Sequence, residues 1–272
     1  MAASVVDPAA KREGVRGGEG TPAVIAAFEI LDLLAGMSEP ARMTEIVEGV
    51  ALPKSSVFRL LRALESIKAV RRDDRDKRYY LGPKFDDYAR ISPTSRLVNR
   101  FLDEAGPILR PLNETAQLGV LTGADVTFVA CIDSTKPVRL VSFVGRTLPA
   151  HASATGKAIL AFAPKQQLET VIAAGLPALT ERTITDPETL RAELEQIRQL
   201  GYATESEEST ANLSCLAAPV WGSSAEVVGA VTLCIPRATL PNNRLTEMRR
   251  AVLEAARCIS TNVPAKASAS QR

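Results

Sequence analysis

The sequence is poor in the residues from which metal sites, disulfide frameworks and aromatic cores are built. Its 272 residues include one histidine and four cysteines, and no two cysteines form a CxxC pair. This spacing argues against a zinc module or a disulfide framework and favours a reducing, cytoplasmic environment. Aromatic residues make up only 4% of the chain, so Val, Ile, Leu and Ala must supply its core. We therefore expect a cytoplasmic protein without a metal or other cofactor.

Long apolar runs are also absent. No stretch approaches the roughly 18 consecutive apolar residues that a membrane-spanning helix needs, so no membrane partner is expected. Residues 1–20 are rich in Ala, Gly and charge and lack the apolar segment of a secretory signal. We expect a disordered arm over residues 1–20 and a disordered tail over residues 263–272. There is no internal repeat, no GxGxxG fingerprint and no GxxxxGK[ST] frame around Lys157, which argues against the common nucleotide-binding loops.

Basic charge is concentrated in one part of the chain. The net charge of the whole protein is only +2, but residues 54–84 hold ten Lys and Arg residues against four Asp and Glu, a local net charge of +6. A local basic surface of this kind is typical of proteins that bind a polyanion such as DNA.

Residues 21–84 show the pattern of three helices followed by a hairpin. Apolar residues recur every three or four positions from Pro22 to Gly36. A second, short helix is expected from Thr44, its predicted N-cap, to Gly49, and a third begins at Pro53. Two β-prone runs, 69–72 and 78–81, flank a turn-like acidic segment and predict a hairpin. This order predicts a winged helix-turn-helix DNA-binding domain over residues 21–84.

The third helix is the candidate DNA-recognition helix. Its first turn, PKSS at residues 53–56, combines the free N–H groups of a helix start with side-chain donors that suit phosphates and base edges. An ordinary amphipathic surface helix is the alternative, but the basic hairpin directly after it favours DNA binding. The candidate DNA-binding residues are Thr44, Lys54, Ser55, Ser56, Phe58, Arg59, Arg62, Arg75, Lys77 and Arg78.

Residues 85–96 have the character of a connecting segment, and a different pattern begins after them. Apolar and β-branched runs predict strands at 126–132, 138–144, 213–220 and 227–235. Helices are expected at 97–112, from residue 153, at 187–200 and at 245–259. This mixture predicts an α+β domain with an antiparallel sheet over residues 97–262. The small residues at 154–156 leave room and free N–H groups for a carboxylate, although tight packing would explain them equally well.

Several separate motifs resemble those of the IclR family of bacterial transcriptional regulators. In the first domain these are TEIV (44–47), LPKSS (52–56) and YYLG (79–82). In the second they are LPAHASATGKA (148–158), GYATE (201–205) and SCLAAPV (214–220). They occur in the order and at the spacing of the family, over residues 21–260.

The resemblance implies a winged helix-turn-helix domain followed by a GAF-like α+β effector-binding and oligomerisation domain. The implied function is sequence-specific regulation of transcription, with repression favoured over activation, and not enzyme catalysis. The implied partners are a double-stranded DNA operator, a second or further copies in a homodimer or tetramer, and a small effector that is an organic acid or an aromatic metabolite. The effector-binding residues carried over from the family are Ala154, Thr155, Glu205, Leu213, Cys215, Thr232 and Cys234.

The chain departs from the family at a few positions. Lys68 stands at the end of the recognition helix, where relatives usually carry glycine; if this position needs a left-handed backbone, lysine costs on the order of 1 kcal/mol. Family members with small-acid effectors often carry Asp or Ser at the positions of Glu205, Thr232 and Cys234. These differences would change the size of the pocket or the class of ligand.

The sequence offers two alternative functions. A thiol hydrolase could use Cys215 and His151, but no evident motif supplies a third, orienting group. A buried small hydrophobe and a hydrogen-bonded structural histidine are the plainer interpretations of these residues. A protein-interaction module without a ligand is the second alternative, and the small and polar residues at 151–157 and 201–215 argue against it.

Overall fold

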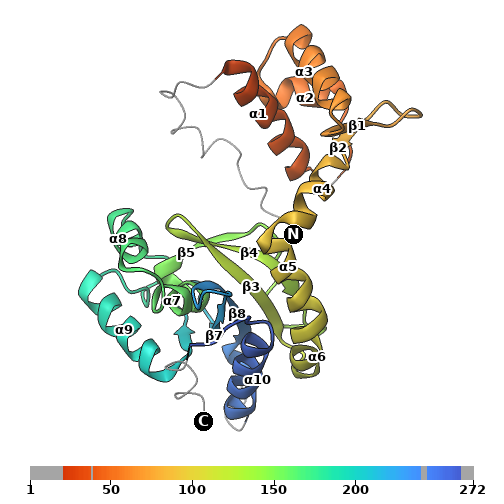
Figure 1. Cartoon of the computed structure of the whole chain (residues 1–272). Helices are drawn as coiled ribbons and strands as arrows, with labels where there is room; N and C mark the ends of the chain where they lie inside the picture. Colours follow the sequence, from red (N-terminus) through yellow and green to blue (C-terminus); the bar gives the residue numbers. More distant parts are fainter. Residues whose placement is uncertain (1–20, 38, 240–243, 265–272) are drawn as a thin grey trace. The chain divides into compact units, whose positions relative to one another are not determined.

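The computed structural model describes residues 21–37, 39–239 and 244–264, and the chain divides after Ser92 into two compact units (Figure 1). The arm expected over residues 1–20 lies outside the described residues, as does most of the expected tail, residues 265–272. The segment expected to connect the domains contains the helices α4 (Lys84–Ile91) and the start of α5 (Pro93–Arg100).

The first unit has the three helices and the hairpin that the sequence predicts. Its elements are α1 (Pro22–Gly36), α2 (Met43–Val50), α3 (Lys54–Ser66), β1 (Val70–Arg72), β2 (Tyr79–Leu81) and α4. The two strands pair antiparallel, with Arg71 opposite Tyr80. One apolar face of each helix meets in a single core, which includes the fully buried Ile30, Ile46 and Val57. The winged helix-turn-helix fold is therefore confirmed.

The start of α2 differs from the prediction. Thr44 lies inside the helix, and the N-cap position belongs to Arg42. The Glu45 carboxylate accepts a hydrogen bond from the Arg42 backbone N–H at 2.5 Å. This is one half of a capping box, and it places the helix start before Thr44.

Lys68 ends the recognition helix in a left-handed conformation, with φ of 63°. The Ala69 N–H donates to the Leu64 carbonyl and the Lys68 N–H donates to the Glu65 carbonyl, both at 2.9 Å. These two bonds make a Schellman motif, in which glycine is the usual residue at the position of Lys68. Gly82 packs against this turn: a Cβ at Gly82 would lie 2.2 Å from the Lys68 carbonyl oxygen. The position of Lys68 therefore needs a left-handed backbone, and in this chain a lysine adopts it.

We expect Lys68→Gly to stabilise the first unit by about 0.5–1 kcal/mol, because glycine adopts positive φ without steric cost but loses more backbone entropy on folding. Hydrogen exchange of the α3 amides in the full chain would measure the gain. Lys68→Ala is the matched control, since it removes the charge and keeps the strain. An equal gain from both variants would show that charge, not backbone conformation, limits stability here.

The second unit is a six-stranded sheet with helices on both faces. The strand order is β5-β4-β3-β8-β7-β6, and each neighbouring pair is antiparallel. The strands are β3 (Thr115–Thr122), β4 (Asp125–Ile132), β5 (Thr147–Pro149), β6 (Ala203–Ser206), β7 (Leu213–Trp221) and β8 (Val227–Pro236). The helical segments are α5, η2 (Phe101–Ala105), α6 (Gly106–Leu109), η3 (Arg110–Leu112), η4 (Ala150–Ala152), α7 (Ala154–Leu160), α8 (Lys165–Ala173), α9 (Pro187–Leu200), η5 (Arg237–Thr239) and α10 (Leu245–Cys258).

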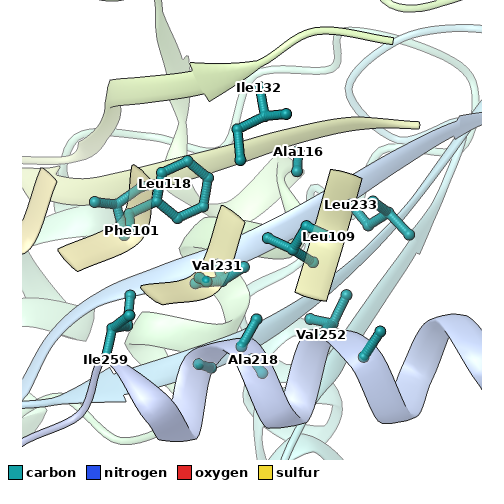
Figure 2. Packing of buried hydrophobic residues seen from close by; sticks show 14 of the residues in the cluster. Phe101, Leu109, Ala116, Leu118, Ile132, Ala218, Val231, Leu233, Val252 and Ile259 are labelled. Carbon is teal, nitrogen blue, oxygen red and sulfur yellow. The ribbon is translucent and has the colours of Figure 1, made fainter. Parts of the chain in front are cut away.

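Alternation along the strands sends apolar side chains to both faces of this sheet. One face packs against η2, α6 and α10 through a core that includes Phe101, Leu109, Leu118, Leu233 and Val252, as Figure 2 shows. The other face packs against α7 and α9 through a second core, which includes Ala217 and Ala230 on the sheet and Ile159 and Leu194 on the helices. The α+β fold class is confirmed, and the sheet is covered on both sides.

The strand predicted over residues 138–144 is wrong. This segment has no strand assignment and forms no ladder with the described strands, and four of its apolar side chains are exposed: Val138, Val141, Phe143 and Val144. A β-prone segment forms a strand only where a neighbouring strand has unpaired backbone N–H and C=O groups. Strand β4 already has β3 and β5 as its neighbours. The segment is instead attached through side chains of β3: the Thr115 hydroxyl donates to the Leu140 carbonyl at 3.0 Å, and the Gln117 amide donates to the Ser142 hydroxyl.

Candidate functional site

The predicted recognition helix turns its polar face to solvent. Val57, Leu61 and Leu64 are buried in the core of the first unit, so the side chains between them point outward. Half of the Phe58 side chain is exposed, and the Arg62 guanidinium lies 6.0 Å from the centre of its ring. The predicted DNA-binding residues Lys54, Ser55, Phe58, Arg59 and Arg62 are all exposed on α3, Ser56 is half-buried there, and Thr44 is exposed on α2.

The hairpin places its predicted residues differently. Arg75 and Lys77 are exposed in the turn, which is built around the Asp73 carboxylate accepting the Arg75 N–H at 2.7 Å. Arg78 is half-buried: its Nη1 donates to the Pro40 carbonyl at 2.7 Å, and its Nε lies 3.5 Å from Asp76. Arg78 thus ties the hairpin to the segment between α1 and α2, while the other two cations are free to meet an anion.

The second unit contains a cavity where six of the seven predicted effector residues meet. Its empty volume, which includes space open to solvent, is about 330 Å³, and about 20 Å³ of this admits the centre of a water molecule. The cavity is therefore narrow. Its predicted lining residues are Ala154 and Thr155 from α7, Leu213 and Cys215 from β7, and Thr232 and Cys234 from β8.

Strand register explains why these residues meet. Cys215 on β7 lies directly opposite Cys234 on β8, and Thr232 lies opposite Gln117 on β3. Opposed residues of antiparallel strands share one face of the sheet, and residues two apart on a strand share it as well. The floor of the cavity is therefore a polar patch on a face that is otherwise apolar.

The start of α7 forms the wall above this floor. Ser153 caps the helix, its hydroxyl accepting the Gly156 N–H at 3.0 Å. The hydroxyls of Thr155 and Thr232 lie 2.6 Å apart, which joins the wall to the floor. Gly156 allows this approach because its backbone packs directly on Ala150.

Glu205 lies beside the cavity but does not line it. It is 2% exposed and stands opposite Cys215 in the register of β6 and β7. Its Oε1 accepts the N–H groups of Glu208 and Ser209 at 2.9 and 2.8 Å and the Ser209 hydroxyl at 3.0 Å. Glu205 therefore holds the segment 207–212, whose Ser209 and Thr210 line the cavity.

A second buried charge holds the same segment. Lys157 on α7 is fully buried, and its Nζ lies 2.8 Å from Glu208 Oε1 and 3.1 Å from Glu193 Oε1 on α9. Burial raises the pKa of Glu208, and the Lys157 charge opposes that rise. The lysine that follows Gly156 is thus part of an internal ion-pair cluster.

Eight of the fourteen residues that line the cavity were not predicted from the sequence. The most informative of these residues is Arg146, the one charged side chain among the described lining residues, and no ion pair to it occurs in the described part of the chain. The sequence signal that could have identified Arg146 is its position just before the LPAHASATGKA motif. The other missed lining residues are Gln117, Phe128, Leu140, Leu148, Ser153, Ser209 and Thr210.

The geometry does not resemble a thiol hydrolase. His151 Nε2 lies 3.2 Å from the Pro177 carbonyl oxygen, and burial lowers the pKa of its imidazole. The Cys215 thiol is hydrogen-bonded to Cys234, and this bond together with burial raises the pKa of Cys215, which is the opposite of an activated nucleophile. Among the interactions of the described residues, none joins His151 to Cys215.

The described residues contain neither a metal-binding cluster nor a membrane-spanning helix. No group of three or more His, Cys, Asp or Glu side chains there is placed to hold a metal ion. The helices of the same residues are all too short or too polar to span a bilayer.

Comparison with known proteins identifies the two units. Residues 23–74 match the IclR helix-turn-helix domain, and residues 97–261 match the C-terminal domain of the bacterial transcriptional regulator IclR. The chain is 33% identical over 265 residues to the HTH-type transcriptional regulator BhcR of Paracoccus denitrificans, covering 95% of this chain and 93% of BhcR. It is 29% identical to the HTH-type transcriptional repressor AllR of Escherichia coli, covering 92% and 93% of the two chains.

A solved structure gives the same answer at the level of the fold. An IclR transcriptional regulator from Alicyclobacillus acidocaldarius superposes with a TM-score of 0.71 at 26% identity, over 93% of this chain and 100% of the other. Since the C-terminal family model alone covers more than half of the chain, the protein belongs to the IclR family of bacterial transcriptional regulators.

Proposed function

We propose that this regulator is a repressor whose affinity for its operator is controlled by a small organic acid bound in the cavity of the second unit. One observation carries the choice of ligand: a lone cation, Arg146, lies in a cavity whose other polar groups are hydroxyls, thiols and an amide. A carboxylate would pair with the guanidinium, and a hydroxyl or oxo group could reach Thr155 or Thr232.

The size of the cavity favours a short aliphatic acid over an aromatic metabolite. With room for little more than the centre of one water molecule, an aromatic ring would have to displace the segments 138–146 or 207–212. An acid of two to four carbons needs a smaller displacement. Repression is the mode of action stated for AllR, and we extend it to this chain.

The proposed DNA contact surface is the outward face of α3 together with the turn of the hairpin. Lys54, Ser55 and Ser56 at the helix start would meet phosphates and base edges, and Arg59 and Arg62 would continue along the groove. Thr44 and Phe58 would flank them. Arg75 and Lys77 would contact the neighbouring backbone, while Arg78 would orient the hairpin. As a homodimer or tetramer, the protein would recognise a palindromic operator with half-sites about 34 Å apart.

Control by the ligand requires two arrangements of the protein with different affinities for DNA. A ligand shifts such an equilibrium only by the difference between its affinities for the two arrangements. The segment 207–212 is the proposed responsive part, because it lines the cavity and is held by Glu205 and by the Lys157–Glu208 ion pair.

Arg146→Gln is expected to weaken acid binding about 10- to 100-fold, because it removes one charge-assisted hydrogen-bonded pair. An operator is first selected from a random duplex pool with the purified protein. Lactate, pyruvate, malate and benzoate are then titrated by calorimetry, and their effect on operator binding is followed by fluorescence anisotropy. The short acids are expected to bind and to release the operator.

Arg59→Ala is the matched control. It is expected to weaken operator binding about 10- to 100-fold and to leave acid binding unchanged. Arg146→Gln should keep operator binding and lose the response to acid. The proposed ligand class would be refuted if none of the acids bound, or if Arg146→Gln bound them as well as the parent protein.

A further inference from the structure

Two cysteine thiols lie side by side on the floor of the cavity. Cys215 and Cys234 are directly opposed on the adjacent strands β7 and β8, and their Sγ atoms are 3.4 Å apart. Both are free thiols and both line the cavity. The arrangement is a preformed dithiol, because the register of the sheet holds the two sulfur atoms in place.

The surroundings hold both thiols in position and keep Cys215 protonated. Cys234 Sγ lies 3.3 Å from the Gln117 Oε1, which accepts its hydrogen bond, and Cys215 is bonded to Cys234. Burial and the nearby Glu205 carboxylate add to the rise in the pKa of Cys215. Oxidation of Cys215 by peroxide requires its thiolate, so these surroundings disfavour oxidation at this cysteine. The two thiols can still react in their neutral form with an electrophile that binds both sulfur atoms at once.

We propose that Cys215 and Cys234 form a binding site for trivalent arsenic, or for a like thiophilic electrophile with two exchangeable hydroxyl groups. Arsenic(III) trihydroxide is small and uncharged at neutral pH, so entry into a narrow cavity does not require a charge to be desolvated. A single pyramidal arsenic atom can join two sulfur atoms at such a separation, and soft sulfur ligands prefer soft acceptors.

The condensation balances without an oxidant or a reductant. Two As–O bonds break and two As–S bonds form. Each thiol proton leaves with one hydroxyl group as water, so two water molecules are released. Arsenic keeps its oxidation state and one hydroxyl group, which would remain in the cavity within the polar patch that contains Thr155 and Thr232.

The other two cysteines serve as internal controls. Cys131 on β4 contacts Asp133 at 3.5 Å, and burial raises its pKa to about 12. Cys258 on α10 donates to the Ala255 carbonyl at 3.3 Å. No sulfur–sulfur hydrogen bond involves either of these cysteines among the described residues. A structure-dependent dithiol adduct should therefore need only Cys215 and Cys234.

Native mass spectrometry of the full chain with sodium arsenite tests this site. The parent protein and the Cys131→Ser/Cys258→Ser variant are expected to gain one As–OH unit and to lose two hydrogens. Cys234→Ser and Cys215→Ser are expected to bind arsenite about 100-fold more weakly, because the second bond is no longer intramolecular. Thermal unfolding of each variant confirms that it is folded before its binding is compared.

Two results would overturn the site: an adduct that persists in Cys234→Ser, or equal affinity in the urea-unfolded parent chain. The first would place arsenic on other cysteines, and the second would show that the folded register contributes nothing. The measurement contains neither DNA nor an organic acid. Its failure would leave the proposed regulation by acids untouched, and the failure of that proposal would leave the dithiol site untouched.

Discussion

Replacing Lys157 with methionine is expected to lower the free energy of unfolding of the second unit by about 3–5 kcal/mol, because it removes one partner of a buried ion pair. Lys157 is fully buried, and its Nζ contacts both carboxylate oxygens of Glu208, at 2.8 and 3.0 Å. Methionine fills similar space but leaves the buried Glu208 carboxyl without its lysine, so that this group must either stay charged and unpaired or take up a proton. Urea unfolding followed by the fluorescence of Trp221, the chain's single tryptophan, reports on this unit.

The pH dependence of this loss has a definite sign. Burial holds the pKa of Glu208 above its usual value even with Lys157 present, and removing the lysine raises that pKa further. The folded state then favours the protonated acid, so the variant should lose stability as pH rises through the pKa of Glu208 in the folded state. Below the ordinary pKa of glutamate, about 4.3, the difference between variant and parent should be smallest.

The double variant Lys157→Met/Glu208→Gln is the matched control. It removes the uncompensated charge together with the lysine and should recover most of the lost stability. If the double variant were as unstable as Lys157→Met, packing around the lysine stem would account for the loss, and the ion pair would not.

Gly156→Ala is expected to destabilise the second unit by about 3 kcal/mol, near the upper end for overpacking. A Cβ at this position would lie 2.1 Å from the Ala150 carbonyl oxygen and 2.5 Å from its Cα. Both are backbone atoms, so α7 must move away from η4. The 2.6 Å contact between the Thr155 and Thr232 hydroxyls would break with it. Urea unfolding measures the first effect, and calorimetry with the organic acids measures the loss of binding.

Gly106→Ala is the control for this substitution. Gly106 is also helical and belongs to the same unit, but a Cβ there would meet the flexible Arg110 side chain at 3.4 Å and the Phe101 carbonyl oxygen at 3.8 Å, an ordinary van der Waals distance. Alanine favours the helix by about 0.5–1 kcal/mol, so this variant should be slightly stabilised. Similar losses from both variants would contradict the argument from close backbone contact.

Much of the first unit could be predicted from local patterns. The three helices and the hairpin follow from apolar spacing, from Pro22 and Pro53 near helix starts and from the acidic turn. The outward face of α3 follows from the same spacing, because Val57, Leu61 and Leu64 must turn inward. The left-handed turn at Lys68 could not be predicted with the rest, because the sequence does not show which carbonyls accept the Lys68 and Ala69 N–H groups.

The second unit depends more on partners distant in sequence. Residues 138–144 have the composition of a strand, yet their backbone finds no ladder among the described strands, and the segment lies beside the cavity instead. Glu205 was expected to meet the ligand, but its carboxylate is used to hold Glu208 and Ser209. Whether the residues named for DNA and for the effector make those contacts stays a prediction.

The local basic charge and the spacing of apolar residues predicted the class of protein from the sequence by itself, while the scarcity of histidine, of paired cysteines and of long apolar runs argued against metal, disulfide and membrane classes. Residue chemistry and periodicity are local properties, and they were enough for a winged helix-turn-helix joined to an α+β domain. Only the tertiary structure decided that Cys215 meets Cys234, that Arg146 enters the same cavity and that Lys157 is neutralised internally. These groups are 19 to 88 residues apart in the sequence, and strand register and helix packing, not local sequence, bring them together.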